Sequence, residues 1–528
     1  MFRTPVSDYA MFRTPVSDYA VFRTPVNMVC AWVGDMLGCG SSILLVLFLL
    51  LLFLFFAPGR RPPNFPPGLP MLPLVGSLLH MRGGPTRPIL RSLRKKYGNM
   101  ASFGIFGTRV VLVSGMATLK EVFADKNSTG RPDMLVTTVR NYILTEGRDS
   151  SVGIIGATGE RWQEQRRFVL RHLRDLGFGK TSYEPLMVDE VAELMNHIQQ
   201  HKGEPLPMKR FFNRSVVNVL WGMVMGKRYS YDDDKMAKLL KTFVQPADFN
   251  LLDPLVFIPG MMKAIMYIPV LKVLTPVKDI IKFMKDELQD FMADKDLISN
   301  NSLTSVYLQE IKNRGSEQSH FNMDQMTGVV MEMFVAGMET TSSTLTTAIY
   351  LVAKHPAVQE RVQQELNTVV GDGRLPSFSD MEKLPYTQAT IHEVQRTFNL
   401  VLFSLPHAAL EDCMLAGYHI PKGTVLLANA DDALSDPELW KNPKEFDPEN
   451  FLDDNGKFIK NEAFIPFGIG KRQCAGEPLA RMELFMFFSC LLHRFSFTIV
   501  EDKGSFTKSP TSNAPPTYTA MAHLRSPL

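Results

Sequence analysis

Cysteine is scarce in this chain, with only five among 528 residues and no regular spacing between them. A disulfide framework is therefore not expected, and the main domain is expected to lie in the reducing cytosol. The chain also lacks an excess of charge of either sign, because it has 57 Lys and Arg residues and 54 Asp and Glu residues, for a net charge of +3. This balance argues against a nucleic-acid partner. The cysteines are Cys30, Cys39, Cys413, Cys474 and Cys490.

Two further absences limit the function and the number of domains. The chain has no flavin or nicotinamide fingerprint, so a redox enzyme of this sequence would have to receive its electrons from another protein. No low-complexity linker divides residues 60–528, although length alone would permit three or four domains. Since 45% of the residues are hydrophobic, the chain can bury a large core, and we expect one domain over residues 77–528.

One long apolar run stands near the N-terminus. Residues 36–59 carry no charge, which satisfies the roughly 20 residues needed to cross a bilayer. Arg60 and Arg61 end the run, and a positive flank stays on the cytosolic side. We therefore predict a single-pass signal anchor of the endoplasmic reticulum, with a cytosolic catalytic domain. A cleaved signal peptide or a mitochondrial presequence fits less well, because the run is long, lacks a small-residue cleavage site and follows Asp residues.

The segments on either side of this run differ in character. Residues 1–10 recur unchanged at 11–20, and a partial third copy follows at 21–26. A ten-residue repeat of mixed polarity does not build a solenoid, so residues 1–35 are expected to be a luminal extension, to which we assign no function. Residues 60–76 contain six prolines and predict an extended linker rather than a helix.

The main chemical motif is the loop of residues 467–476. Cys474 stands there among three glycines, just before an apolar helix that begins near Glu477. A helix N-terminus with Lys471 and Arg472 nearby supplies the positive potential that a thiolate needs. The glycines permit close approach of the backbone to a ligand. A structural cysteine in a turn is the alternative, so the other motifs of the chain decide between the two.

A second motif lies in a long predicted helix over residues 323–353. Gly337 costs roughly 1 kcal/mol relative to Ala inside a helix, which indicates close approach of a ligand or a local widening of the helix. Thr340 can turn its hydroxyl onto the preceding backbone carbonyl. Glu339 beside it completes a carboxyl and hydroxyl pair that can relay protons. The alternative is a Thr/Ser-rich helix with one solvent-facing Glu.

Two residue pairs at helical spacing add to these motifs. Trp162 and Arg166 lie four apart on a predicted helix, and their N–H donors suit an anionic, flat-edged group. A core aromatic is the alternative for Trp162. Glu393 and Arg396 lie three apart on a predicted helix over residues 386–398, which sets both side chains on one face. On a surface such a pair would contribute little stability.

Together these motifs resemble the cytochrome P450 family, from about Pro62 to the C-terminus. The resemblance is carried by five positions of the loop, Phe467, Gly470, Arg472, Cys474 and Gly476. It implies haem b as the cofactor, with Cys474 as the axial ligand of the iron, and oxygenase chemistry. The further haem contacts that it implies are at Trp162, Arg166, His407, Arg472, Ala336 and Gly337.

The resemblance also assigns roles to residues away from the loop. Glu339 and Thr340 would deliver the protons that O–O cleavage consumes. Glu393 and Arg396 would be buried and would brace the haem side of the core. The family commonly has an Arg where this chain has Asn450, so a three-way ionic clamp is in doubt, although Asn450 can still hydrogen-bond Glu393.

The implied fold is mainly α with a small β-sheet near the N-terminal side, preceded by the transmembrane helix. Periodicity predicts further helices over residues 184–200, 277–294, 355–371 and 477–495. A hairpin is expected over residues 103–113, around Gly107.

The helix that carries Trp162 is strongly basic, which bears on partners. Five Arg residues between positions 161 and 174 face only Glu164, and such a face favours docking of an acidic electron donor. A solvated helix face is the alternative. The resemblance is to the microsomal branch of drug, fatty-acid and steroid hydroxylases. It implies NADPH-cytochrome P450 reductase as the partner, with cytochrome b5 as a second candidate donor.

The substrate is expected to be small and lipophilic, and to enter from the lipid bilayer. Residues 249–274 are apolar and interrupted by proline, which favours a lid that dips into the membrane over plain helix packing. Phe398, Phe403 and the strand over residues 400–405 would make one side of the cavity apolar. The sequence does not identify the substrate itself.

We therefore predict a haem-thiolate monooxygenase that hydroxylates or epoxidises its substrate. One alternative is a haem-thiolate isomerase or dehydratase that acts on lipid hydroperoxides, which the Glu339 and Thr340 pair disfavours. The other is a membrane haem-binding protein without catalysis, which would leave the pair and the basic helix without a purpose.

Overall fold

The computed structural model describes residues 44–49, 61–73, 75–81, 84–132, 135–149, 151–231, 233–242, 275–315, 320–503 and 512–525. The chain divides into two compact units, Met1–Ala57 and Pro58–Leu528. All the helices and strands named below belong to the second unit.

The N-terminal predictions fall largely outside the described residues. Of the expected span over residues 36–59, only residues 44–49 are described, and they are helical with every side chain exposed. The repeats in residues 1–35 and the expected lid over 249–274 lie outside the described residues. In the part of the chain that the structure does describe, no helix is both long enough and apolar enough to cross a membrane.

The second unit is mainly helical. Its α-helices are α2 (Arg87–Tyr97), α3 (Met116–Ala124), α4 (Leu135–Leu144), α5 (Gly159–Asp175), α6 (Glu184–Gln200), α7 (Asn213–Met225), α8 (Asp234–Thr242), α10 (Thr275–Ala293), α11 (Lys295–Ser299), α12 (Leu303–Arg314), α13 (Met323–Lys354), α14 (Pro356–Val370), α15 (Pro385–Phe398), α16 (Ala430–Ala433) and α17 (Glu477–Arg494). Its 3₁₀ helices are η1 (Leu78–His80), η2 (Lys126–Thr129), η3 (Thr181–Tyr183), η7 (Phe378–Lys383), η8 (Pro448–Phe451) and η9 (Gly470–Arg472). Its strands are β1 (Met100–Ile105), β2 (Thr108–Val113), β3 (Leu206–Pro207), β4 (His407–Ala408), β5 (Cys413–Leu415), β6 (Tyr418–Ile420), β7 (Val425–Ala428), β8 (Phe495–Asp502) and β9 (Tyr518–Leu524).

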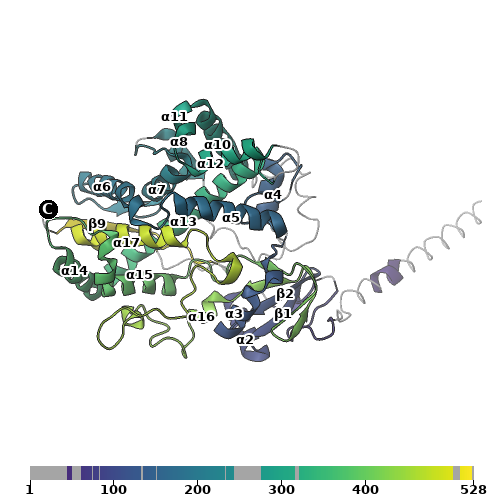
Figure 1. The fold of residues 1–528 in the computed structure, drawn as a ribbon. Coiled ribbons are helices and arrows are strands. Elements are labelled where there is room, and N and C mark those ends of the chain that lie inside the picture. Colours follow the sequence, from purple (N-terminus) through teal and green to yellow (C-terminus); the bar gives the residue numbers. More distant parts are fainter. Residues whose placement is uncertain are drawn as a thin grey trace, which may run out of the picture. The chain divides into compact units, whose positions relative to one another are not determined.

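Helix α13 runs through the middle of this unit (Figure 1). Asn322 caps its start by accepting a hydrogen bond from the backbone N–H of Gln325 at 2.8 Å. Its side chains are buried on nearly all sides, against α7, α10, α15 and α17. Trp221 of α7 packs edge to face on Phe334 of α13, with ring centroids 5.0 Å apart. A helix buried all round is the core of the domain and can carry groups that must be kept from water.

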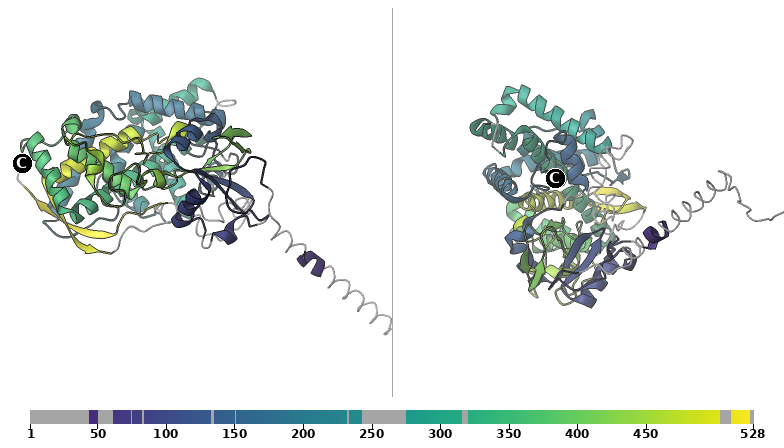
Figure 2. Two further views of the ribbon diagram at one scale, coloured as in Figure 1. Left: turned by 90° about the horizontal axis from the view of Figure 1, so that it is seen from below. Right: turned by 90° about the vertical axis from the view of Figure 1, so that its right-hand side faces the viewer.

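The described residues of the unit also form three small sheets. The largest has the strand order β1-β2-β7-β4, in which β2 and β7 run parallel and pair Val110 with Val425. The second has the order β3-β9-β8, and β5 pairs with β6 as a hairpin. Figures 1 and 2 show β1 and β2, with α2 and α3, at one end of the unit and β9 at the other.

The predicted helices are confirmed. Those expected over residues 184–200, 277–294, 355–371 and 477–495 are α6, α10, α14 and α17, each within two residues at both ends, and the long core helix is α13. The hairpin is confirmed too, with its turn at Phe106 and Gly107, whose φ values are 44° and 81°. The sheet expected near the N-terminal side contains β1 and β2, but two of its four strands, β4 and β7, come from residues 407–428.

The proline-rich segment lies along β1 and is not helical over its described residues. Ser102 donates its backbone N–H to the carbonyl of Pro67 at 2.8 Å, and Leu69 donates to the carbonyl of Ser102 at 2.9 Å. The backbone of Gly68 approaches so closely that an added Cβ would lie 1.7 Å from the carbonyl oxygen of Ser102. The segment therefore pairs with the sheet of the second unit.

Candidate functional site

The loop of residues 467–476 folds back on itself just before α17. Cys474 donates its backbone N–H to the carbonyl of Phe467 at 2.9 Å, which closes the loop. Gly470 has a φ of 77°, and an added Cβ there would lie 2.0 Å from the carbonyl oxygen of Phe123. Only glycine fits this position, because both the backbone conformation and the contact with α3 exclude a side chain.

The thiol of Cys474 is free, and its surface is accessible. Burial among protein atoms raises its pKa, and the carboxylate of Glu477 raises it further, whereas the backbone N–H groups of Gly476 and Glu477 and the guanidinium of Arg166 lower it. An added Cβ on Gly476 would meet Cys474 Sγ at 3.8 Å, which is an ordinary contact. The positive end of α17 thus faces the sulfur, while a nearby carboxylate acts against it.

One face of α13 is accessible in the middle of the core. Ala336 is exposed, and Gly337 and Thr340 are half-buried. Thr340 Oγ1 donates to the carbonyl of Ala336 at 2.7 Å, which is the backbone contact that the sequence predicts. An added Cβ on Gly337 would lie 2.5 Å from Leu220 Cδ2, so the close approach that the structure shows at this glycine is to a side chain of α7 rather than to a ligand. The cofactor contacts of Ala336 and Gly337 remain predictions.

The side chain of Glu339 is buried, unlike that of Thr340. It accepts hydrogen bonds from Asn213 Nδ2 of α7 at 3.4 Å and from Ser343 Oγ at 3.3 Å. The alternative of a solvent-facing Glu is therefore wrong. The relay through Glu339 and Thr340 remains a prediction.

Trp162, His407 and Arg472 come together between α5, β4 and η9. The guanidinium carbon of Arg472 lies 3.9 Å from the ring centroid of Trp162. Trp162 Nε1 is buried and has no hydrogen-bond partner within the described structure. His407 Nδ1 donates to the carbonyl of Ser128 at 2.7 Å, which fixes the ring and directs Nε2 away from η2. Arg472 itself donates to the carbonyls of Thr129, Ile154 and Ala157.

Arg131 belongs to the same cluster, although no pattern in the sequence singles it out. Its guanidinium donates to the carbonyl of Ile155 at 3.1 Å and to those of Leu405 and Pro406 at 2.9 and 2.8 Å. It is one isolated Arg directly before Pro132, and no motif of the chain marks it. Only the folded chain shows that it faces the other cations.

The cluster holds more positive charge than the chain compensates. Burial lowers the pKa of Arg472 to about 8, and Arg131 and Arg166 contribute by repulsion. Burial also lowers the pKa of Arg131 to about 10, with repulsion from Arg166, and burial with repulsion from Arg131 and Arg472 lowers that of His407 well below its usual value. Glu332 opposes the shifts of Arg131 and Arg472, and it is already paired with Arg140 at 2.7 Å.

Arg166 lies next to the cysteine. It donates to the carbonyl of Gln473, the residue before Cys474, at 2.5 Å. Burial lowers its pKa, and the charge of Cys474 opposes that shift. Its predicted contact with a haem propionate remains a prediction.

Glu393 and Arg396 of α15 form a fully buried ion pair. Arg396 Nη2 lies 2.6 Å from Glu393 Oε1, and Nε lies 2.7 Å from Oε2. Arg396 also donates to four backbone carbonyls between residues 434 and 445. Asn450 Nδ2 donates to Glu393 Oε1 at 3.2 Å, so a neutral hydrogen bond stands where a third charge would complete a clamp. Burial raises the pKa of Glu393, and Arg396 opposes this rise.

These features fit the haem that the sequence predicts. A guanidinium keeps its proton in proteins, so neighbouring buried guanidinium groups require a negative partner. The two propionates of haem are such a partner, and the indole N–H of Trp162 can donate to them. The accessible Cys474 thiol at the N-terminus of α17 is of the type that can ligate iron, and its role as the ligand remains a prediction.

The predicted apolar wall of the substrate cavity is partly wrong. Leu402 and Phe403 are buried in the core beneath the four-stranded sheet, with Phe103 and Leu427. Their apolar side chains pack inside the protein and are not available to a substrate. Val401 and Leu405, by contrast, are only half-buried.

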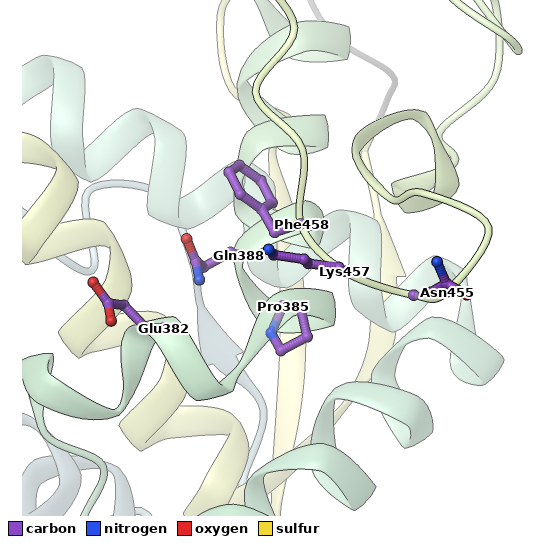
Figure 3. A pocket seen from close by; sticks show the side chains of 7 residues that line it. Glu382, Pro385, Gln388, Asn455, Lys457 and Phe458 are labelled. Carbon is purple, nitrogen blue, oxygen red and sulfur yellow. The ribbon is translucent and has the colours of Figure 1, made fainter.

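A surface hollow away from these residues is shown in Figure 3. It is lined by Glu382, Pro385, Gln388, Asn455, Gly456, Lys457 and Phe458. None of the predicted site residues lines it, so we assign it no part in the chemistry.

Comparison with known proteins agrees with this geometry. The family model described as Cytochrome P450 matches residues 66–520. The chain is 38% identical over 480 residues to cytochrome P450 2D14 of Bos taurus, which covers 88% of this chain and 93% of the relative. It is 37% identical over 467 residues to cytochrome P450 2D6 of Homo sapiens, and the alignment covers 87% of this chain and 92% of the relative. It is 36% identical over 476 residues to cytochrome P450 2J1 of Oryctolagus cuniculus, and that alignment covers 88% of this chain and 91% of the relative.

Proposed function

Because the chain belongs to the cytochrome P450 family, we propose that it inserts one oxygen atom of O2 into a small lipophilic substrate, by hydroxylation or epoxidation. Family membership makes it a haem-dependent oxidoreductase. The observation that carries the proposal is the free Cys474 thiol at the start of α17, beside a cluster of cations whose opposing carboxylate, Glu332, is already paired with Arg140.

Haem, when bound, supplies an iron that activates dioxygen, and a thiolate ligand favours O–O cleavage over oxygen carriage. Cys474 would be that ligand, held by the closed loop and by the N–H groups of Gly476 and Glu477. Trp162, His407 and Arg472 would bind the propionates, and we add Arg131 to this set. Closing the site around these groups excludes water from them.

Thr340 is the group that we propose to hold a proton at the accessible face of α13. Its hydroxyl hydrogen points to the carbonyl of Ala336, so the lone pairs of Oγ1 face away from the helix and can accept a hydrogen bond from a water molecule. Glu339 would supply protons from the buried side, where Asn213 and Ser343 hold its carboxylate. Thr340→Ala should lower the amount of product formed per NADPH consumed, whereas Thr340→Ser should retain most of it.

Electrons would come from NADPH-cytochrome P450 reductase, with cytochrome b5 as a second donor. Arg167, Arg171 and Lys471 are exposed, and the described structure records no ion pair for any of them. An acidic partner could therefore use their charge without breaking existing contacts. Reversing Arg171 to Glu should slow reduction by the reductase and leave chemical reduction unchanged.

We also propose that residues 36–59 anchor the protein in the endoplasmic reticulum membrane, with the catalytic domain in the cytosol. The exposed apolar side chains of residues 44–49 support this, since exposed apolar side chains on a helix suit lipid. Removal of residues 1–59 should release the catalytic domain from membranes in a flotation assay.

The test of the proposal is the difference spectrum of the reduced protein with carbon monoxide, recorded beside a Cys474→Ser variant. A strongly red-shifted Soret band that the variant loses is the expected result. NADPH consumption with reductase and a panel of lipophilic compounds then separates an oxygenase from an isomerase or a haem carrier. Folded protein without the band would refute thiolate ligation.

A further inference from the structure

Arg481 of α17 connects the Cys474 loop to helix α15. Its guanidinium binds the carboxylate of Glu477 through Nε at 2.9 Å and Nη2 at 2.8 Å. Its Nη1 lies 2.9 Å from Nε2 of His392. The same guanidinium lies 5.1 Å from the ring centroid of Phe467, the first residue of the loop. Contacts with three different segments therefore fix its position.

His392 acts in this contact as a neutral acceptor. Its Nδ1 donates to the carbonyl of Gln388 at 2.7 Å, so Nε2 must accept from Arg481. Three phenylalanine rings surround it, with centroids 4.7 to 5.5 Å away, namely Phe451, Phe458 and Phe464. Burial, together with repulsion from Arg481, lowers the pKa of His392 to about 3. Its ring therefore stays uncharged at neutral pH and can orient Arg481 without repelling it.

Glu477 connects Arg481 to the cysteine. Its Oε2 accepts from Gln473 Nε2 at 2.7 Å, and Gln473 directly precedes Cys474. The carboxylate stands at the first position of α17, where the positive helix end that a thiolate would use also stabilises Glu477. A negative charge so close disfavours a second one, unless a cation compensates it. Arg481 provides that cation.

We propose that Arg481, oriented by His392, is a positioning residue that neutralises Glu477 and so keeps Cys474 bound to iron as a thiolate. This inference rests on the proposed function, because it requires haem ligation by Cys474. From sequence, Glu477 and Arg481 are an ordinary i, i+4 pair, which usually contributes little. The buried acceptor on α15 and the link through Gln473 give this pair its role.

The test measures how the thiolate signature decays in the full-length holoprotein. Samples are reduced with dithionite, so that docking of a redox partner does not affect the result, and the red-shifted carbon monoxide band is followed with time. Arg481→Gln should lose this band roughly tenfold faster than wild type, the effect expected for one charge-assisted hydrogen bond. The double variant Glu477→Gln/Arg481→Gln should return to within about twofold of wild type, because the two changes are coupled.

A matched control is available on α12. Arg314 and Glu310 form an i, i+4 pair of the same type, and Arg314 also binds Glu164 of α5. Arg314→Gln should decay at the wild-type rate. His392→Gln should decay faster than wild type but more slowly than Arg481→Gln, since it removes the orienting contact and keeps the charge.

Two results would overturn the inference. One is an Arg481→Gln protein that loses the red-shifted band no faster than wild type. The other is a double variant that loses the band as fast as Arg481→Gln does, because packing rather than charge would then explain the loss. If Arg481→Gln does not fold, Arg481→Met replaces it, because Met also removes the charge, and a wild-type rate for that variant would equally refute the inference. A wild-type protein without the red-shifted band would refute the proposed function instead, so the two failures are distinct.

Discussion

Replacing Arg131 with Gln should weaken the retention of haem. The guanidinium is held in place by the carbonyls of Ile155, Leu405 and Pro406 and faces the same cluster as Arg472. A hydrogen bond to a charged group contributes about 1.5–3 kcal/mol, so losing one to a propionate should speed haem loss roughly 10- to 160-fold. Arg131→Lys keeps the charge but not the forked geometry of the guanidinium, so its rate of haem loss should lie between those of wild type and Arg131→Gln.

The assay is the transfer of haem from the holoprotein to an excess of a haem-free globin, followed by absorbance. Arg148→Gln is the control, because Arg148 pairs with Asp324 at 3.1 Å on the surface, with 66% of its side chain exposed. The control should release haem at the wild-type rate. If Arg131→Gln also did so, the assignment of Arg131 to the propionates would be refuted, and with it the argument that the cation cluster requires an anion.

Three further predictions concern stability, measured as the denaturant midpoint of the second unit. Gly337→Ala places a Cβ 2.5 Å from Leu220 Cδ2, which should destabilise the fold by about 1–3 kcal/mol through overpacking. This cost should exceed the gain of about 1 kcal/mol in helix propensity, so the variant should be less stable than wild type. In a Leu220→Ala background the overpacking cost should disappear. Asn450→Ala should cost about 1–2 kcal/mol by removing a donor to Glu393, and a loss as large as that of Glu393→Gln would contradict this. Since the pKa of His392 falls to about 3 in the fold, the unfolded chain binds its proton first, and stability is lost as pH falls from about 6.5 towards 3. His392→Gln should therefore lose less stability than wild type between pH 7 and 5, and equal losses would contradict the assignment.

The helices could be predicted from sequence because their signals are local. Helix α14 begins at Pro356 and ends before Gly371, and its apolar residues recur at helical spacing. The four-stranded sheet could not be predicted in full, because β4 has two residues and β7 has four, too few to show alternation. Their pairing depends on contacts between distant parts of the chain.

In the candidate site, too, the residues marked by local sequence signals could be predicted, and those that depend on distant contacts could not. The Cys474 loop could be recognised because glycines, a cysteine and a helix start stand together in the sequence. The role of Arg131 could not, because it arises only when burial brings it to Arg472 and Arg166. Leu402 and Phe403 were misplaced because an apolar side chain serves a core and a cavity equally well.

The parallel pairing of β2 with β7 has a consequence for synthesis of the protein. Val110 pairs with Val425, so the hairpin of β1 and β2 leaves the ribosome long before its neighbour strand exists. At about 5–20 residues per second, the open edge of β2 waits about 15–60 s for its partner. The side chains of Val110 to Val113 alternate between the two faces of the sheet and are all fully buried in the finished protein, so the nascent chain presents an apolar strand edge throughout that time. Newly made chains should thus depend on a chaperone that shields this strand until residues 425–428 have been translated.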